Sequence, residues 1–300
     1  MSNWEIQIIQ ALRDVATNFF DILFEAITFF GEKEVLIVLL IFIYFIYSKK
    51  VGQRMAFAIF SSLLLNNVIK GIVMRERPWK HPKANYQPVR PETATGSSFP
   101  SGHTQNSAVT YTSFALEFKK KSITIVVGVL VLLIGFSRIY LGVHYPTDVV
   151  AGIALGISCA VAGTYLHHKC ENSFRKQYLL YIVLLIIFLP FIFIFWRTNY
   201  QEIMLYRDFY TSFAFFAGYV VAIGLEYRFV NFINEASVKI KIIRAVIALI
   251  LVVGVLFGLK TVLPKQNIMM DMLRYFLIPV IGLGLYPIIT KKVLFITHKQ

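Results

Sequence analysis

The stretch Ser137-Arg-Ile-Tyr-Leu-Gly-Val-His-Tyr-Pro-Thr-Asp148 separates two long apolar runs, one ending near Phe136 and the other starting near Val149. It places an arginine, a histidine and an aspartate within twelve residues. Ionisable side chains at membrane depth are costly, so they are candidates for function. The stretch therefore predicts two membrane-crossing helices with a polar site where they connect.

The composition is that of a chain embedded in a membrane. Of its 300 residues 57% are hydrophobic and only 15% are charged, and the mean hydropathy is +0.65. Soluble domains carry about 25% charged residues, and a membrane-spanning helix needs about 20 mostly apolar residues. We therefore predict an all-α fold, a polytopic transmembrane helical bundle with about nine spans. The expected spans are 34–48, 54–74, 103–118, 122–141, 146–166, 177–196, 208–227, 242–262 and 273–290.

The N-terminal segment has a different pattern. Residues 4–30 combine apolar residues with charged ones, among them Arg13, Asp14, Asp21 and Glu25. A helix with one apolar and one charged face lies in the membrane interface rather than across it. Residues 1–30 are thus expected to form an N-terminal amphipathic interfacial helix.

The net charge of +14 does not indicate nucleic-acid binding, because the basic residues are spread over short loops between the apolar runs. Lys and Arg accumulate in the cytoplasmic loops of membrane proteins. Alternate loops on one side hold sixteen basic residues and those on the other side twelve, of which seven lie around 70–90 and at 138. If these seven residues have a functional role, only five orienting basic residues remain on the second side, against sixteen on the first. The first side is then expected to be cytoplasmic. The Ser137–Asp148 stretch and the 75–102 loop would then both face out of the cytoplasm.

Two further polar clusters are predicted on that outer side. In the first, Lys70 and Arg77 are seven residues apart, a spacing that places them on one face of a helix, which Pro78 would end. In the second, Pro100-Ser101-Gly102-His103 stands directly before an apolar run. A Ser-Gly turn that opens a helix can direct backbone N–H groups at an anion.

The third cluster lies in the opening stretch. His144 and Asp148 are four residues apart, the spacing of neighbours on a helix. Asp148 can accept the ring N–H of His144 and fix its tautomer, which leaves the other ring nitrogen free to attack an electrophile. Arg138 adds a cation beside them.

Together the clusters supply the parts of a phosphoryl-transfer site. Lys70, Arg77 and Arg138, with the N–H groups near Ser101 and Gly102, could bind the three equatorial oxygens of a phosphoryl group. Neutral His144 could attack phosphorus, and protonated His103 could donate a proton to the leaving oxygen.

No metal or other cofactor is expected. The 75–102 loop offers only two carboxylates, Glu76 and Glu92, and the two cysteines, Cys159 and Cys170, form no zinc pattern. The fixed cations would neutralise the phosphoryl charge, a role that magnesium has in other enzymes.

Each cluster alone also has a structural interpretation. A lone Lys or Arg at the end of a span usually reaches toward the headgroups as an anchor, and a His–Asp pair at this spacing is more often a surface contact. The three clusters are predicted on the same side, and each supplies a part that the others lack. Their joint occurrence therefore favours a functional site over separate structural roles.

At these residues the chain resembles the type 2 phosphatidic acid phosphatase superfamily, which includes membrane lipid phosphatases, glucose-6-phosphatase and vanadium haloperoxidases. The shared pattern is Lys-x6-Arg-Pro, then Pro-Ser-Gly-His, then Ser-Arg-x5-His-x3-Asp, and every position is present here between residues 70 and 148. The resemblance implies a phosphohistidine formed on His144, oriented by Asp148, with His103 as general acid and then as base. It implies that Lys70, Arg77, Ser101, Gly102 and Arg138 hold the phosphoryl group.

The resemblance also implies an arrangement and a substrate class. Residues 31–168 would form the phosphatase core, whereas residues 169–300, predicted to be additional C-terminal transmembrane helices, depart from the common pattern of the family. The protein would sit in the cell membrane, with its active site on the extracytoplasmic side. It would hydrolyse phosphatidic acid, phosphatidylglycerol phosphate or undecaprenyl pyrophosphate, and vanadate or phosphate would inhibit it. A further hypothesis is that the aromatic and basic loop 79–99, with Lys80, Lys83 and Arg90, captures an anionic lipid.

Other functions remain open from the sequence. They are a phosphatase for a soluble sugar phosphate, a phosphotransferase that uses a lipid donor, and a lipid transporter or scaffold on the same fold. A transporter would be expected to have lost the His144–Asp148 pair, which is present. The exact lipid and the oligomeric state are not predicted.

Overall fold

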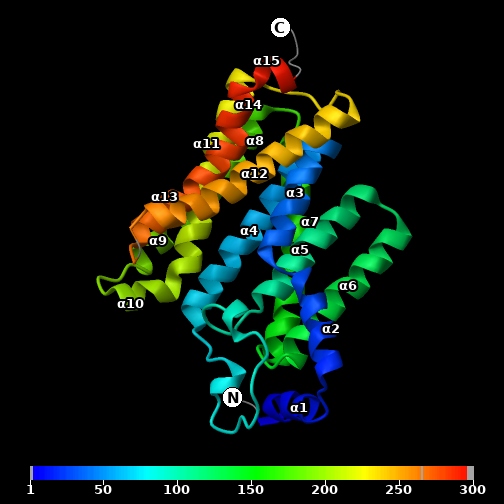
Figure 1. Ribbon diagram of the computed structural model, residues 1–300, viewed down its shortest axis with the longest axis vertical. Coiled ribbons are helices and arrows are strands. Elements are labelled where there is room, and N and C mark those ends of the chain that lie inside the picture. Colours follow the sequence, from blue (N-terminus) through cyan, green and yellow to red (C-terminus); the bar gives the residue numbers. More distant parts are fainter. Residues whose placement is uncertain (1–2, 265, 296–300) are drawn as a thin grey trace. The chain divides into compact units, whose positions relative to one another are not determined.

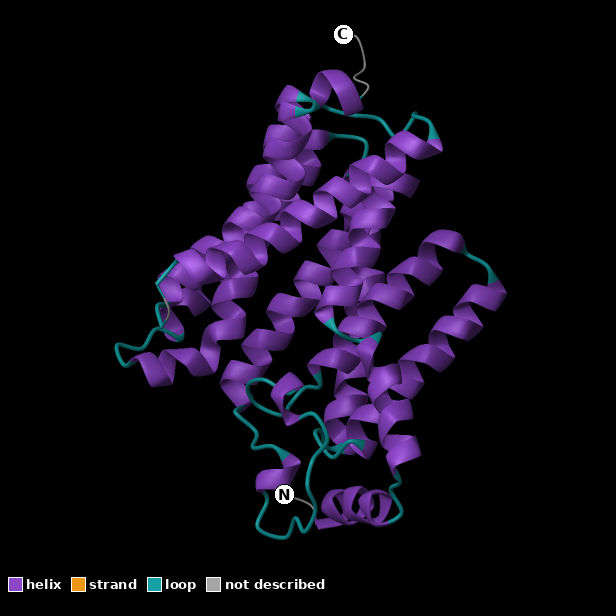
Figure 2. Cartoon of the chain, in the orientation of Figure 1, coloured by secondary structure: helices purple, strands orange, loops and turns teal. Residues whose placement is uncertain are grey.

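The computed structural model describes residues 3–264 and 266–295, and every regular element in these ranges is helical (Figures 1 and 2). The predicted all-α fold is therefore confirmed. The longer helices are α1 (Asn3–Asp14), α2 (Asn18–Phe29), α3 (Lys33–Phe42), α4 (Lys49–Val73), α5 (Gly102–Phe118), α6 (Lys121–Tyr140), α7 (Pro146–Cys170), α8 (Phe174–Phe188), α11 (Arg207–Phe229), α12 (Val238–Val262) and α13 (Ile268–Pro279). The short ones are α9 (Pro190–Ile194), α10 (Tyr200–Ile203), α14 (Tyr286–Ile289) and α15 (Lys291–Leu294).

Seven helical stretches in the described ranges are long and apolar enough to cross a membrane, by length and composition. They are Lys49–Lys80, Lys121–Tyr140, Pro146–Cys170, Phe174–Ile194, Tyr200–Phe229, Val238–Val262 and Ile268–Ile289. The predicted number of about nine spans is thus only approximate.

The two expected spans outside this set are short helices. The stretch 34–48 forms α3 and a π-helical turn, Ile43–Tyr47. The stretch 103–118 forms α5, which has 17 residues. At a rise of 1.5 Å per residue α5 is about 26 Å long, which is less than the hydrocarbon thickness of about 30 Å.

The N-terminal segment forms two helices where the sequence predicted one. α1 ends at Asp14 and α2 begins at Asn18. Thr17 caps the second helix, because its Oγ1 accepts a hydrogen bond from the N–H of Phe20 at 3.4 Å. A side-chain cap of this kind replaces an intrahelical bond and starts a new helix.

The chain divides into two compact units. The first comprises Met1–Ile37 and Ser61–Tyr165, and the second comprises Val38–Phe60 and Leu166–Gln300. In the first unit α6 packs against α5, α2 and α1. In the second, α11 packs against α8 and α13, and α12 packs against α13. The predicted domain ranges 1–30, 31–168 and 169–300 remain a prediction.

Two glycines on α7 allow the start of α5 to approach it closely. A Cβ atom on Gly152 would lie 2.9 Å from the carbonyl oxygen of Ser101, and one on Gly156 would lie 2.6 Å from that of Gln105. Neither distance is compatible with a side chain at these positions. The first turn of α5 is therefore held directly against α7.

A buried polar contact joins α4 to the same turn of α5. Nδ2 of Asn66 donates to Oε1 of Gln105 at 2.7 Å, and Nε2 of Gln105 donates to the carbonyl oxygen of Ser62 at 2.9 Å. Buried amides need such partners, because an unpaired one costs about 1–3 kcal/mol. The end of α4 and the start of α5 are thus fixed relative to each other.

The second unit contains buried ion pairs of its own. Lys49 pairs with Glu226, which is fully buried, and Arg54 pairs with Glu171 at 2.6 Å. Removing one partner of such a pair leaves a buried charge uncompensated. These pairs tie the first turns of α4 to α11 and to the residues that follow α7.

Candidate active site

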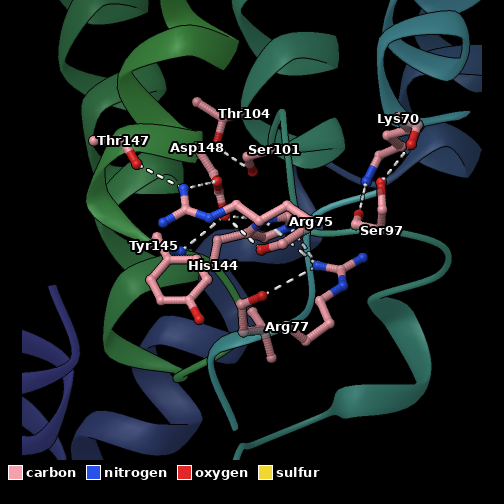
Figure 3. A network of polar contacts seen from close by, with 12 residues as sticks. Lys70, Arg75, Arg77, Ser97, Ser101, Thr104, His144, Tyr145, Thr147 and Asp148 are labelled. Carbon is pink, nitrogen blue, oxygen red and sulfur yellow. Dashed lines mark hydrogen bonds and ion pairs between the residues drawn. The ribbon is translucent and has the colours of Figure 1, made fainter. Parts of the chain in front are cut away.

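Three segments of the first unit meet at one of its ends, as Figure 3 shows. They are the loop that follows α4, the first turn of α5, and the connection between α6 and α7. Backbone hydrogen bonds join them: Val89 N to Leu141 O at 2.9 Å and Ser101 N to Asp148 O at 3.0 Å. The 75–102 loop and the Ser137–Asp148 stretch, which the sequence predicted on one side of the membrane, therefore lie side by side.

His144 and Asp148 are in contact, with 3.4 Å between Nδ1 of His144 and Oδ2 of Asp148. The route to this contact differs from the prediction, which placed both residues on one helix. α7 begins at Pro146, so His144 lies in the turn before it and Asp148 in its first turn. Both side chains are buried.

Asp148 has several donors besides His144. Oδ2 accepts from Tyr145 N at 3.0 Å and from Ser98 Oγ at 2.5 Å, and Oδ1 accepts from Arg75 Nη1 at 2.7 Å. A carboxylate with this many donors is held in one orientation.

Arg77 lies directly against His144, with 2.9 Å from its Nη1 to Nε2 of the imidazole. The prediction that Lys70 and Arg77 share a helix face is wrong. α4 ends at Val73, and Met74 has a φ of 50°, which turns the chain out of the helix. The Arg77 guanidinium is fixed instead by three carbonyl oxygens, those of Thr95, Gly96 and Val143.

These contacts define the tautomer of His144. A guanidinium only donates hydrogen bonds, so Nε2 of His144 accepts from Arg77 and carries a lone pair. The ring proton of neutral His144 is therefore on Nδ1, which faces Asp148. This is the tautomer predicted for a nucleophile, with Nε2 as its reactive atom.

Lys70 lies at the end of α4 beside the start of α5. Its Nζ donates to the carbonyl oxygen of Ser97, and Oγ of Ser97 donates to the carbonyl oxygen of Lys70 at 2.9 Å. A Cβ atom on Gly102 would lie 3.9 Å from Cε of Lys70. Lys70 and Gly102, predicted to bind the same group, are thus neighbours.

Ser101 and Gly102 form the start of α5. The N–H of Ser101 is bonded to Asp148, and its Oγ lies 2.9 Å from Oγ1 of Thr104. The first hydrogen bond of the helix runs from Gln105 N to Ser101 O. The N–H groups of Gly102 and His103 precede it, so they have no acceptor within the helix and can bind an anion.

Arg138 and His103 each present a buried nitrogen without a hydrogen-bond partner in the described part of the chain: Nε of Arg138 and Nε2 of His103. The other Arg138 nitrogens are held, Nη1 by Thr28 at 2.9 Å and Nη2 by Thr93 at 3.4 Å. Buried donors without partners are costly. A bound group rich in oxygen would satisfy both.

Burial lowers the pKa of His144 well below its usual range, and the charges of Arg77, Lys70 and Arg138 lower it further. His144 is therefore neutral at pH 7. The charges of the three predicted cations thus reach one imidazole, and together with burial they also lower the pKa of His103.

The sequence analysis missed Arg75, Ser98, Thr147 and Glu5. Arg75 bonds to Asp148, to Thr147 Oγ1 at 2.7 Å and to Glu5 Oε2 at 2.7 Å. A signal for Arg75 was present, because it stands between the two basic residues Lys70 and Arg77. No local pattern distinguishes Glu5 from the other charges of the N-terminal segment.

No group of three or more His, Cys, Asp or Glu side chains that could hold a metal ion occurs within residues 3–264 and 266–295. The expectation that no metal is required remains a prediction.

Two family models match the chain. One, described as "PAP2 superfamily", matches residues 52–172, and the other, "PAP2 superfamily phosphatase, transmembrane extension", matches residues 210–297. The first covers all the predicted site residues.

Named relatives are membrane lipid phosphatases. The chain is 35% identical over 144 residues to "Phosphatidylglycerophosphatase B" of Bacillus subtilis, a match that covers 44% of this chain and 67% of the relative. It is 29% identical over 133 residues to "Lipid A 1-phosphatase" of Rhizobium johnstonii, covering 43% of this chain and 53% of the relative.

Among solved structures, the chain is similar to the crystal structure of a transmembrane PAP2 type phosphatidylglycerolphosphate phosphatase from Bacillus subtilis. The identity is 28%, the TM-score is 0.46, and the match covers 55% of this chain and 85% of the other.

Proposed function

Because the chain belongs to the PAP2 superfamily of membrane phosphatases, we propose that it hydrolyses the phosphate of a membrane lipid through a phosphohistidine intermediate and without a metal ion. One observation carries the proposal: the lone pair of His144 Nε2, whose tautomer is set by Arg77 and Asp148, lies among fixed cations. A neutral imidazole with a positioned lone pair is a competent nucleophile for phosphorus.

In the first step, Nε2 of His144 attacks phosphorus and the bond from phosphorus to the lipid oxygen breaks. The imidazole becomes cationic, and Asp148 stabilises that charge through Nδ1. Burial and the nearby cations lower the pKa of His103, and the negative charge of the bound phosphoryl group opposes this effect and favours its protonated form. His103 then donates its proton to the departing lipid oxygen. Lys70, Arg77 and Arg138 hold the three equatorial oxygens while charge develops on them.

In the second step, His103 takes a proton from a water molecule, which attacks phosphorus. The N–P bond breaks, orthophosphate leaves and neutral His144 returns. The same residue acts first as acid and then as base, as microscopic reversibility requires when both steps pass through one site.

Arg77 has to change its hydrogen bond when substrate binds. In the substrate-free site its Nη1 donates to the lone pair that attacks phosphorus. Transfer of that bond from Nε2 to a phosphoryl oxygen frees the nucleophile and binds the substrate in one movement. The carbonyl oxygens of Gly96 and Val143, at 3.1 Å each, keep the guanidinium close throughout.

The proposed substrates are lipid phosphates of the phosphatidic acid, phosphatidylglycerol phosphate or undecaprenyl pyrophosphate type. The names of both relatives describe phosphatases of lipid phosphates, which supports the class. The site would face out of the cytoplasm from the cell membrane, as the charges of the loops favour. Vanadate would inhibit as a mimic of the five-coordinate phosphorus of the transition state.

The test is phosphate release by the purified protein in detergent containing EDTA. The substrates are phosphatidic acid, phosphatidylglycerol phosphate, undecaprenyl pyrophosphate and glucose 6-phosphate, and His144→Ala is the control. We expect release from a lipid and none from the control. Preferential release from glucose 6-phosphate would replace the lipid proposal with the sugar-phosphate one.

A radiolabelled substrate tests the intermediate separately. We expect a protein-bound phosphate that is labile in acid and stable in base, absent from His144→Ala. Turnover without such a label, or loss of turnover in EDTA that added divalent metal restores, would contradict the mechanism.

A further inference from the structure

We propose that Glu5 and Arg75 form a positioning pair that holds the Asp148 carboxylate against His144 and makes the N-terminal helix α1 a part of the catalytic apparatus. The proposal rests on the proposed function, in which His144 is the nucleophile and Asp148 orients it.

The pair forms an unbroken chain of contacts to the nucleophile. Oε2 of Glu5 lies 2.7 Å from Nη2 of Arg75, and Nη1 of Arg75 lies 2.7 Å from Oδ1 of Asp148. The other oxygen of Asp148 faces Nδ1 of His144. Figure 3 shows the Arg75 guanidinium in contact with both Thr147 and Asp148.

Glu5 also binds the first turn of α7. Its Oε1 accepts from Oγ1 of Thr147 at 2.6 Å and from the N–H of Thr147 at 3.2 Å. Thr147 directly precedes Asp148. A carboxylate at the N-terminus of a helix is also favoured by the helix dipole. Glu5 therefore fixes Asp148 in two ways, through Arg75 and through the backbone of its neighbour.

The burial of Glu5 is unusual for a helix at a membrane interface, since only 2% of its surface is exposed. Burial alone would raise its pKa, but hydrogen bonds from Thr147 and Arg75 outweigh that effect and the pKa of Glu5 lies below its usual range. Glu5 is thus ionised at neutral pH. Burial of a charged carboxylate costs free energy of folding, and hydrogen bonds and ion pairs with its partners offset that cost.

An apolar contact docks α1 at the same place. Ile6 and Ile9 pack on Tyr145, whose ring faces the Arg75 guanidinium at 3.8 Å. Tyr145 stands between His144 and the start of α7. Arg75 is thus enclosed by an aromatic face and two carboxylates, which leaves its two nitrogens in a single arrangement.

Positive and negative charges alternate along this chain of contacts, which explains why Glu5 is needed as a second carboxylate beside Asp148. Transfer of the phosphoryl group makes the His144 ring positive, and Asp148 stabilises that charge. Arg75 alone would orient Asp148 but would also offset its charge. Glu5 neutralises Arg75, so that orientation is retained while Asp148 keeps its effect on His144.

This role predicts a change in the chemical step rather than in binding. In Glu5→Gln we expect kcat to fall about 10- to 100-fold, as for loss of a residue that orients a catalytic group, with KM for a soluble phosphate ester unchanged within about twofold. Arg75→Lys should lose a similar amount, because an ammonium cannot bond to Glu5 and Asp148 in the same bidentate geometry.

Asp21→Asn is a matched control. Asp21 pairs with Arg13 at 2.6 Å and so joins α2 to α1 by an ion pair that does not involve Asp148. We expect its kcat to stay within about twofold of the native value. An equal loss in Asp21→Asn and Glu5→Gln would reduce the role of Glu5 to docking of α1 and overturn the proposal. So would unchanged kcat in Glu5→Gln, or a loss confined to KM.

A measurement on the resting protein separates this proposal from the proposed function. ¹⁵N chemical shifts of histidine-labelled protein in detergent report which ring nitrogen of His144 carries the proton. We expect the Nδ1–H form in the native protein, in Asp21→Asn and in Arg75→Gln, because Arg77 donates to Nε2 in each of them. The ¹H shift of Nδ1–H reports the strength of its hydrogen bond to Asp148, and we expect it to move upfield in Arg75→Gln but not in Asp21→Asn. An unchanged ¹H shift in Arg75→Gln would overturn the positioning role even if turnover is observed, and the expected change would support it even if no tested lipid is hydrolysed.

Discussion

Nη1 of Arg77 lies 2.9 Å from Nε2 of His144, the nitrogen that has to reach phosphorus in the proposed reaction. The cation thus covers the proposed nucleophile. This contact protects the lone pair from protonation, because a proton on Nε2 would face the guanidinium. In the proposed reaction the residue that covers the nucleophile would also bind the phosphate.

Replacement of Arg77 by lysine tests this double role. We expect Arg77→Lys to lower kcat/KM about 100-fold, or about 3 kcal/mol, as for loss of one donor to a developing oxyanion. A lysine retains the charge, but it cannot bond to three carbonyl oxygens and to His144 at once. Steady-state kinetics with a lipid and a soluble ester measure the loss. Native kinetics would contradict the role.

His103→Ala should separate the two steps. Without its proton donor, a lipid alkoxide leaves slowly, whereas p-nitrophenolate needs no protonation. We expect phosphoenzyme to form from p-nitrophenyl phosphate and to persist, because the base for the second step is also missing. Quenched-flow measurement of bound phosphate checks this result. Complete absence of phosphoenzyme, in a folded variant, would argue against His103 as the acid.

Asp148→Asn should reduce kcat strongly, by about 10²- to 10⁴-fold. The amide can present an N–H to Nδ1 of His144, which would move the ring proton to Nε2 and block the nucleophile. Circular dichroism and thermal unfolding should show that the helices are retained. A kcat within about tenfold of native would leave the carboxylate without its proposed role.

The pH dependence should follow the lowered pKa of His144. Below its pKa the imidazole is protonated and cannot attack, so kcat/KM falls on the acid side. Since burial and the charges of Arg77, Lys70 and Arg138 hold that pKa below 6.5, the acid limb should lie well below pH 6.5. Lys70→Met removes one positive charge, so the limb should move to higher pH. A shift to lower pH would contradict the assignment.

The loop between α4 and α5 is the segment that we hypothesised to capture the headgroup of an anionic lipid. Arg90 is paired with Glu32 at 3.0 Å, whereas Lys80 and Lys83 are exposed. We therefore expect the double variant Lys80→Gln/Lys83→Gln to raise KM for an anionic lipid about threefold to tenfold and to leave KM for a soluble ester unchanged. Arg90→Gln, by contrast, should act through the loss of the Glu32 contact. Equal effects of the lysine variant on both substrates would refute the hypothesis.

The sequence predicted which residues lie together better than it predicted their local geometry. His103, His144 and Asp148 were selected because a general acid, a nucleophile and an orienting carboxylate have characteristic residue types and spacings. The helix on which Lys70 and Arg77 were placed ends at Val73, because Met74 adopts a positive φ that the residue types in that stretch do not predict. The roles of these residues stay a prediction, and the shared helix face of Lys70 and Arg77 was wrong.

Arg75 and Glu5 show a second limit. Seventy residues separate them in the chain, and their contact depends on α1 docking against Tyr145. No local sequence pattern predicts the packing between elements that are far apart in the chain. In the N-terminal segment, likewise, the side chain of Thr17 ends one helix and starts another, a detail that the amphipathic pattern over 4–30 does not contain.

In the proposed topology, the shortness of α5 would set the depth of the candidate site in the membrane. Lys119, Lys120 and Lys121 follow the last turn of α5 and suit the cytoplasmic headgroup layer in the proposed topology. Counted from there, the about 26 Å of α5 end about 4 Å below the opposite headgroup layer. Gly102 and His103 would therefore lie where acyl chains begin rather than in open water. A lipid phosphate has to sink by only a few ångströms with its chains still in the leaflet, whereas a sugar phosphate would have to leave bulk water to reach the same point.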